Sequence, residues 1–355
     1  MKALLFGQIG LRKKRCLAEL EDFARSKGKV LKCFSTGPLM YGADPTIKPH
    51  HILQKDISDL TALRSRIWDQ LISSINADDS CSHFLINSHS TFRWSRGLFP
   101  GFTNQEIQSL NPDICITLID DIHDIKYSMY HRQHKPTPFT LKDIIIWREE
   151  EILASEFAAS IVGCKHYIVA KKQCPELLYK LIFQNDLKKA YLSYPITLVK
   201  DNEPIWTSIC DFRQQVSNRM ICFDPIAISE GFIEGEYKKA SVQKKRRKLI
   251  DIPVEDTTMR LPFDEVAEVI PNIQGQIIAR DFKLINQSDM VIAYIPEVNG
   301  SPAISTGVER ELAYAQKATL DTYVIWPSTR HPSPFLEATR TFSSLAQLLA
   351  KVNEL

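Results

Sequence analysis

The chain has 355 residues, more than one typical domain of about 100–200 residues, which predicts two domains. Its 44 Lys and Arg side chains balance 42 Asp and Glu side chains, so the net charge of +2 gives no reason to expect a nucleic-acid or membrane partner. No apolar run approaches the roughly 18–20 residues of a membrane-spanning helix, and the start MKALLFGQIG lacks the cleavage site of a signal peptide. Eight scattered cysteines without CxxC spacing indicate free thiols in a cytoplasmic protein.

Strands and helices alternate along the first half of the chain. Short apolar runs predict strands at 2–7, 30–35, 83–89, 113–120 and 166–170. Helices are expected between or after them, at 11–27, 57–75, 142–162 and 175–183. This alternation predicts a parallel sheet with helices on both faces.

The alternation begins again in the second half. We expect strands at 189–196, 220–226, 290–296 and 322–327, and helices at 204–216, 274–287, 308–317 and 342–351. The polar stretch 229–259 contains KKRRK, which we interpret as a solvated helix face or loop rather than a nucleic-acid site. The predicted fold class is therefore α/β, with two doubly wound parallel-sheet domains at 1–186 and 187–355.

A glycine turn follows the first predicted strand and opens the first helix. Gly7 and Gly10 allow backbone N–H groups to converge on phosphate oxygens, and a helix N-terminus favours an anion. Lys13 stands where the lysine of G-x-x-x-x-G-K-[ST] reaches the outer phosphates, but Arg12 replaces the second glycine and Lys14 the hydroxyl that binds Mg²⁺. The loop predicts nucleotide contacts by both glycines and both lysines. A tight turn with solvated basic residues is the alternative.

Three further segments of this half carry a family resemblance: STGPLMYGA (35–43), NSHSTFRWSRGLFPGF (87–102) and LNPDICITLID (110–120). In order and spacing, residues 1 to about 130 resemble the archaeal type of adenylate kinase. The resemblance implies the fold of a nucleoside-monophosphate kinase, with ATP or another nucleotide at the phosphate loop.

This half differs from that family at positions that bind metal and phosphate. Asn87 stands where the family has an acidic residue, and Arg132 is the only arginine of the lid region 127–140. Phosphoryl transfer depends on positioning and charge neutralisation. The departures therefore predict a domain that binds or senses a nucleotide but transfers phosphate poorly. A phosphotransferase in which Lys13 and Lys14 together replace Mg²⁺ is an alternative.

Acidic residues gather near the end of a predicted strand in the second half. In open α/β sheets, ligands bind beyond the carboxyl ends of the strands, and the loop VNGSPAIST lies at such an end. Thr306 and Glu309 have the spacing of a capping box, so we interpret Glu309 as a helix cap. Glu311 lies past the first helical turn, and spacing alone favours a surface carboxylate there.

Three motifs bear on whether Glu311 is a surface carboxylate or a catalytic one. They are Arg280-Asp281, eight residues before Asp289 (289 − 281 = 8), the octapeptide STGVEREL that contains Glu311, and AYLSYPIT on the first strand of this half. Residues 189 to about 330 resemble the nucleoside 2-deoxyribosyltransferase superfamily, including its 2'-deoxynucleoside 5'-monophosphate N-glycosidase branch.

The resemblance implies a role for each motif. Glu311 would attack or electrostatically stabilise C1' of the sugar, because a carboxylate suits an oxocarbenium-like centre. Asp281 would orient the sugar or protonate the leaving base.

The same resemblance implies the substrate contacts. Ser305, Thr306 and Gly307 at a helix N-terminus would hold a 5'-phosphate. Ser193 and Tyr194 belong to the loop that contacts the nucleoside, and Tyr194 replaces the usual glycine. Its ring would fill part of the pocket or stack on the base.

These features predict an enzyme that cleaves or exchanges the N-glycosidic bond of a (deoxy)nucleotide and needs no cofactor for that step. The alternatives are an adenylate-kinase-like phosphotransferase, a glycohydrolase of NAD or another ribosyl compound, and a non-enzymatic nucleotide-binding or scaffold protein. The expected partner is a small-molecule nucleotide, without membrane contact, and the resemblance also allows a homodimer. We predict no metal site and solvated side chains for the histidines of the polar loops, which are His50, His51, His123, His131 and His134.

Overall fold

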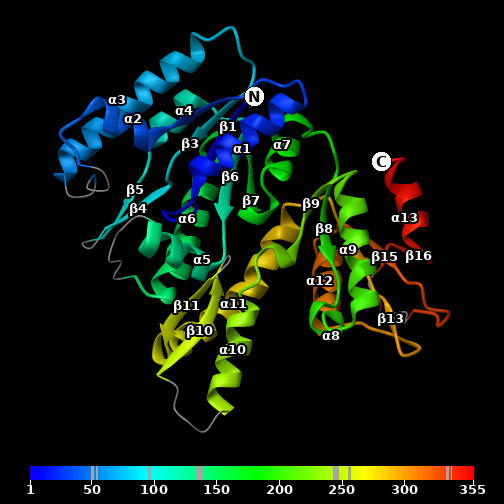
Figure 1. The fold of residues 1–355 in the computed structure, drawn as a ribbon. Coiled ribbons are helices and arrows are strands. Elements are labelled where there is room, and N and C mark those ends of the chain that lie inside the picture. Colours follow the sequence, from blue (N-terminus) through cyan, green and yellow to red (C-terminus); the bar gives the residue numbers. More distant parts are fainter. Residues whose placement is uncertain are drawn as a thin grey trace. The chain divides into compact units, whose positions relative to one another are not determined.

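The computed structural model describes residues 1–48, 52, 55–94, 97–132, 139–242, 248–254, 257–332, 336 and 338–355. The chain forms two compact units. Unit 1 comprises Met1–Ile182 and Ile228–Gly275, and unit 2 comprises Phe183–Ala227 and Gln276–Leu355. Each unit is built on a five-stranded parallel sheet with helices on its faces (Figure 1), so the predicted α/β class with two parallel sheets is confirmed.

The sheet of unit 1 has the strand order β2-β3-β1-β6-β7. Its central strands, β1 (Lys2–Phe6), β3 (Phe84–Asn87) and β6 (Ile114–Ile119), are apolar and almost wholly buried. β2 (Lys32–Ser35) and β7 (Lys165–Ala170) form the edges. Continuous apolar runs are expected where helices cover both faces of a parallel sheet.

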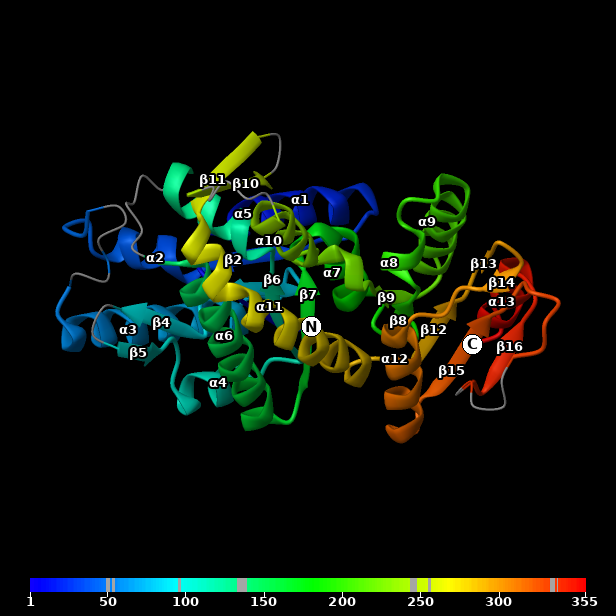
Figure 2. The same ribbon diagram turned by 90° about the horizontal axis from the view of Figure 1, so that it is seen from below.

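Two sets of helices cover this sheet. One core joins alternate residues of β1, such as Leu4 and Phe6, to α3, α4 and α6 (Ile57–Asn76, Asn104–Leu110 and Leu141–Val162). Figure 2 shows α1 (Lys13–Ser26) and α7 (Glu176–Phe183) on the other side of the sheet. The rings of Phe23 and Tyr179 join these two helices at a centroid distance of 5.2 Å.

Several short elements of unit 1 were not expected. They are α2 (Thr36–Ala43), α4, α5 (Ile122–Tyr127), the π-helix Ser128–Arg132, and the antiparallel hairpin of β4 (Thr91–Trp94) and β5 (Gly97–Pro100). Each is at most eight residues long, which is too short to show a clear period in the sequence.

The segment Ile228–Gly275 belongs to unit 1, although the expected boundary at 186/187 assigned it to the second domain. It contains α10 (Gly231–Val242), the antiparallel pair β10 (Leu249–Val254) and β11 (Thr257–Pro262), and the start of α11 (Phe263–Asn286). The polar stretch expected at 229–259 is therefore largely helix and hairpin. Of the KKRRK motif, residues 244–247 lie outside the described part of the chain.

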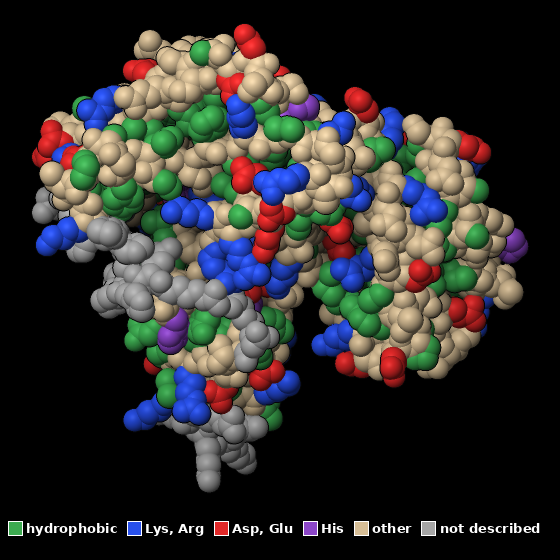
Figure 3. Space-filling view, turned by 45° about the horizontal axis from the view of Figure 1, so that its top comes forward, with side chains coloured by type: hydrophobic (Ala, Val, Ile, Leu, Met, Phe, Trp, Pro, Cys, Tyr) green, Lys and Arg blue, Asp and Glu red, His purple; other side chains and the backbone are tan. Residues whose placement is uncertain are grey.

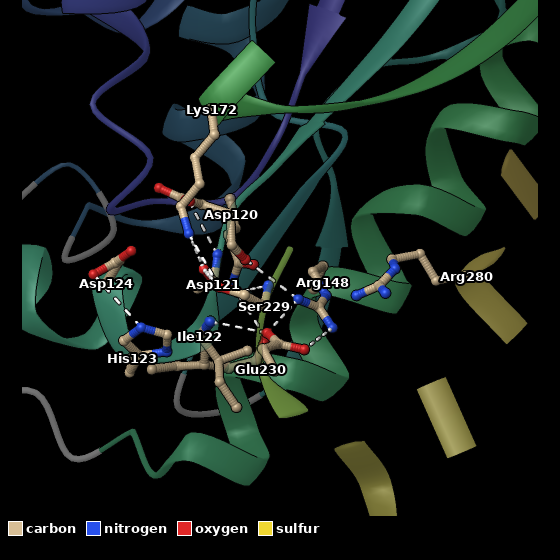
Figure 4. Close-up of polar contacts among 12 residues, drawn as sticks. Asp120, Asp121, Ile122, His123, Asp124, Arg148, Lys172, Ser229, Glu230 and Arg280 are labelled. Carbon is tan, nitrogen blue, oxygen red and sulfur yellow. Dashed lines mark hydrogen bonds and ion pairs between the residues drawn. The ribbon is translucent and has the colours of Figure 1, made fainter. Parts of the chain in front are cut away.

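A buried ion pair explains this placement. Glu230 is 1 % exposed, and its carboxylate accepts two hydrogen bonds from the Arg148 guanidinium, at 2.6 and 3.0 Å, and one from the Ile122 N–H at 3.0 Å (Figure 4). Glu265 of α11 also accepts from Lys126 and from the Leu141 N–H. Sequence patterns carry no signal for such pairing between distant segments.

The sheet of unit 2 has the order β16-β15-β12-β8-β9. Its strands are β8 (Lys189–Ser193), β9 (Ile221–Phe223), β12 (Met290–Tyr294), β15 (Asp321–Ile325) and β16 (Arg340–Phe342). Numbered by chain position, the order is 2-1-3-4-5, that of flavodoxin-like doubly wound sheets. β16 occupies the start of the helix expected at 342–351, so that helix, α13, begins only at Leu345.

The two faces of this sheet differ. One core packs β8, β12 and β15 against α9 (Glu203–Ser217) and α13 (Leu345–Val352). Figure 2 shows α12 (Thr306–Lys317) on the other side of these strands. The short helix α8 (Ile196–Val199) follows β8, and the hairpin of β13 (Glu297–Val298) and β14 (Ser301–Pro302) leads into α12.

Candidate functional site

Strand β8 places two hydroxyl groups at the point where the strand order of unit 2 reverses. β8 lies between β9 and β12, and ligands of such sheets bind outside the carboxyl ends of the strands there. Tyr191 and Ser193 are two residues apart, so both point to the same face of the sheet. Both side chains are fully buried, and both reach Glu311 of α12.

Glu311 is the centre of this cluster. The Tyr191 hydroxyl donates to Oε1 at 2.9 Å, and the Ser193 hydroxyl donates to Oε2. Burial, followed by the charge of Asp281, raises the pKa of Glu311 to about 8, although both hydroxyl donors favour the carboxylate. At pH 7 most molecules therefore carry a proton on this side chain.

Asp281 of α11 is the second carboxyl group. Burial raises its pKa against the opposing charge of Arg280, which lies 3.1 Å from its Oδ1. Arg280 and Asp281 are 6 % and 9 % exposed. Burial thus raises the pKa of both neighbouring carboxyl groups, which suits an acid–base pair.

The N-terminus of α12 corrects the expected role of Glu309. The cap is Ser305, whose extended backbone precedes the helix and whose Oγ accepts from the Val308 N–H at 3.3 Å. The capping-box position is then Val308, so Glu309 is not the cap and is exposed. Thr306 and Gly307 are exposed in the first turn.

Tyr194 lies in the core rather than in an open site. It is 4 % exposed, its ring packs near Trp206 and Phe212, and its hydroxyl donates to Asp224 Oδ1 at 2.6 Å. Arg213 binds the other oxygen of Asp224, also at 2.6 Å. The Tyr194 side chain therefore packs in the core beneath the loop that follows β8, and its ring is not exposed for stacking on a base.

The structure thus brings Glu311, Asp281 and Ser193 together and adds Tyr191, which the sequence analysis missed. The signal was present, because Tyr191 and Ser193 alternate along one strand and must share a face.

The glycine loop of unit 1 has the strained backbone that its glycines predict. Gly7 has φ 143° and Gly10 has φ 95°. A Cβ at Gly7 would lie 2.7 Å from the carbonyl oxygen of Leu118, so only glycine fits. Arg12 takes a left-handed conformation, with φ 54°, at the position directly before α1.

Lys13 is held inside unit 1. Its ammonium group donates to the carbonyl oxygens of Gly7 and Ser88, and it lies 3.3 Å from His89 Nδ1. Burial lowers the pKa of Lys13 to about 8, against the attraction of Glu151. Burial opposes ionisation of Glu151 too, but His89, Lys13 and Ser90 together hold its pKa below the usual value. Lys13 is therefore compensated by backbone and carboxylate oxygens of the protein.

A cavity of about 380 Å³ lies beside this loop. Apolar groups dominate its walls, and Lys14, which is exposed, stands among the lining residues. Gln8 and Asn87 also line it, and in the described part of the chain Gln8 Oε1 and Asn87 Oδ1 have no hydrogen-bond partner although they are buried. The apolar lining comprises Ile9, Leu11, Pro38, Met40, Tyr41, Ile52 and Phe92.

A second cavity of unit 1, about 610 Å³, is lined by charged residues of both signs: Arg12, Arg15, Lys171, Lys172, Asp120 and Asp124. The inserted segment contributes Ser229, Phe232 and Pro253 to its wall. Lys171 binds Asp120 at 2.5 Å, and Lys172 binds Asp121. Figure 3 likewise shows Lys and Arg side chains interspersed with Asp and Glu over the face that it presents.

His123 is 3 % exposed, so the expectation of a solvated side chain is wrong for this residue. It lies with Asp121 and Asp124 at the start of α5 (Figure 4), with one ligand atom of each within 4.8 Å of the others. Both oxygens of Asp121 already accept hydrogen bonds, from the Ser229 N–H at 2.8 Å and from Lys172. We therefore assign no metal to this group. His50, His51, His134 and the Arg132 side chain lie outside the described residues.

Comparison with known families and with curated proteins finds no family model and no relative that matches this chain. Among the described residues, no helix is long and apolar enough to cross a membrane.

Proposed function

We propose that unit 2 cleaves or exchanges the N-glycosidic bond of a (deoxy)nucleotide. The observation that carries this proposal is the pair of the partly exposed Glu311 and the buried Asp281 at the carboxyl edge of a doubly wound sheet. Two hydroxyl donors orient Glu311, and the neighbouring Asp281 helps to keep a proton there. Such a pair resembles the two carboxyl groups of glycosidases. We also propose that unit 2 has the fold of a nucleoside deoxyribosyltransferase domain.

The chemistry follows from the proton that Glu311, with a pKa of about 8, carries at neutral pH. When the bond between C1' and the base nitrogen breaks, the base leaves with the electron pair and takes up this proton. The pair then carries one more negative charge, beside the positive charge that develops on the sugar. Water, or a second base, attacks C1' and gives up a proton to the Glu311 carboxylate, which completes hydrolysis or exchange and restores the acid.

The N-terminus of α12 supports a phosphorylated substrate. Ser305 caps a helix of 12 residues, and Thr306 and Gly307 in its first turn are exposed. Unpaired N–H groups and the helix dipole make such an end a favourable place for a 5'-phosphate. We therefore favour a nucleotide over a nucleoside as substrate.

The test is incubation of the full chain with deoxynucleoside and ribonucleoside 5'-monophosphates, the matching nucleosides, and NAD. Free base is measured by chromatography. We expect release from monophosphates to exceed release from the matching nucleosides. Release of nicotinamide from NAD alone favours the glycohydrolase alternative, and no release from any compound contradicts the proposal. Adding a second free base distinguishes exchange from hydrolysis.

For unit 1 we propose nucleotide binding without efficient phosphoryl transfer, on the fold of a nucleoside-monophosphate kinase. The cavity beside the glycine loop offers apolar walls for a base and two unpartnered amide oxygens for its N–H or hydroxyl groups. Lys13 is already bound to oxygens of the protein, which leaves Lys14 as the accessible ammonium of the loop. Calorimetry with ATP and AMP tests binding. A coupled assay for diphosphate formation tests the phosphotransferase alternative, for which we expect no turnover.

A further inference from the structure

Two thiols of unit 1 lie next to each other on neighbouring strands. Cys115 is on β6, and Cys164 directly precedes β7. Their sulfur atoms are 3.7 Å apart, within hydrogen-bond distance for thiols. The register pairs Cys115 with His166, two residues after Cys164, so alternation puts both thiols on the same face of the sheet. Both lie at the core that β6 shares with α6.

The two thiols differ in access to solvent. Cys115 is 0 % exposed, whereas Cys164 is partly exposed, where the chain leaves Gly163 at the end of α6 and enters β7. The hydrogen bond between them lowers the pKa of Cys164, while that hydrogen bond and burial raise the pKa of Cys115. The reachable thiol is thus also the one that ionises first, as a reactive cysteine requires.

We propose that Cys164 and Cys115 form an oxidisable dithiol, with Cys164 as the thiol attacked by a hydroperoxide and Cys115 as its resolving partner. In the first step the Cys164 thiolate attacks the distal oxygen of the hydroperoxide; an S–O bond forms, the O–O bond breaks, and the alkoxide or hydroxide leaves, so that Cys164 becomes a sulfenic acid. In the second step the Cys115 sulfur attacks the sulfenic sulfur, and a disulfide and water form. The peroxide is reduced, and the two thiols are oxidised.

A bridge at this position acts on the edge of the sheet. In the part of the chain that the structure describes, β7 pairs only with β6, and the disulfide would covalently join this edge strand to its neighbour. The two cysteines are 49 residues apart, so the bridge also closes a long loop in the unfolded chain. Cytoplasmic disulfides are usually transient, and a thiol reductant would restore the dithiol.

The test treats the reduced, folded chain with a small excess of hydrogen peroxide and then blocks the remaining thiols with N-ethylmaleimide. Non-reducing peptide mapping should show a cross-link between the Cys115 and Cys164 peptides, with the mass of two hydrogen atoms lost. Dithiothreitol should reverse it. The melting temperature of the oxidised form should be higher by several degrees. A bridge that forms only in denaturant contradicts the proposal.

Three variants distinguish the roles. Cys164→Ser should abolish the cross-link, whereas Cys115→Ala should leave a sulfenic acid on Cys164 that dimedone traps. Cys16→Ala is the matched control, because Cys16 is hydrogen-bonded to a different thiol, that of Cys174, and its loss should leave the bridge intact. The proposal is overturned if peroxide links only Cys16 to Cys174 in the wild type, or if dimedone traps Cys164 there without a cross-link.

Discussion

Lys13 in unit 1 and Glu311 in unit 2 each end with a pKa of about 8, and burial moves them there from opposite sides. Their surroundings differ. Lys13 faces two carbonyl oxygens and the carboxylate of Glu151, so its charge is compensated by the protein. Glu311 has a second acid, Asp281, as its neighbour, and the nearby Arg280 offsets the two acids only in part, because the pKa of each remains raised. Lys13, whose charge is compensated, is expected to support the fold, and the pair of acids with raised pKa is expected to support chemistry.

Removing the acid at Glu311 tests its catalytic role and should have the largest effect. We expect Glu311→Gln to lower kcat/KM for base release at least about a thousandfold, which corresponds to about 4 kcal/mol of transition-state stabilisation. Glu309→Gln is the matched control, since Glu309 is exposed on the same helix and should retain wild-type activity. Equal losses in both variants, measured by chromatography of free base, would contradict the assignment.

In unit 1 we expect the substitution Glu151→Gln to destabilise the fold. Lys13 would remain buried without its counter-charge, so we expect the free energy of unfolding to fall by about 3 kcal/mol. Glu150→Gln is the control, because Glu150 pairs with Arg93 where each side chain is 25 % exposed, and its loss should cost under about 1 kcal/mol. Urea unfolding measures both. Similar values for the two variants would show that Lys13 needs no counter-charge.

The pH dependence of stability should show the raised pKa of Glu311 directly. A carboxyl group whose pKa is raised on folding contributes stability below its unfolded value, near 4.5, and loses it as pH rises to about 8. Glu311→Gln cannot ionise. Relative to wild type it should gain stability between pH 4.5 and 8, by a few kcal/mol at most, and no further above that. Urea unfolding at pH 5 and pH 9 measures the difference. An unchanged difference would mean that Glu311 is ionised in the folded protein.

Much of this arrangement could be predicted from the sequence, because apolar runs indicate the five strands of the first sheet, four of the five strands of the second, and most longer helices; β16 was not predicted. The family resemblance, rather than spacing, led us to expect Asp281 and Ser193 in one site with Glu311, and the structure has both near it. The cap at Ser305 was missed by one residue, since capping depends on the backbone angles of the residue that precedes the helix. The sequence did not indicate that Ile228–Gly275 belongs to unit 1, because this placement depends on the ion pair of Arg148 and Glu230, which are 82 residues apart.

The substitution Ser193→Ala should have the smallest effect on activity, and it acts specifically on the pKa of Glu311. If base release uses the proton of Glu311, kcat/KM should fall tenfold per pH unit above the Glu311 pKa of about 8. Ser193 donates to the Glu311 carboxylate and so favours ionisation. Ser193→Ala should raise that pKa and shift the falling limb upward by up to about one pH unit. Activity that instead keeps rising above pH 8 would show that Glu311 works as a carboxylate and that its proton is inhibitory. Ser193→Ala would then move the rising limb upward and lower kcat/KM at pH 7 by up to about tenfold. The pKa rises in both cases, so the sign of the change in kcat/KM on that limb decides which protonation state of Glu311 reacts.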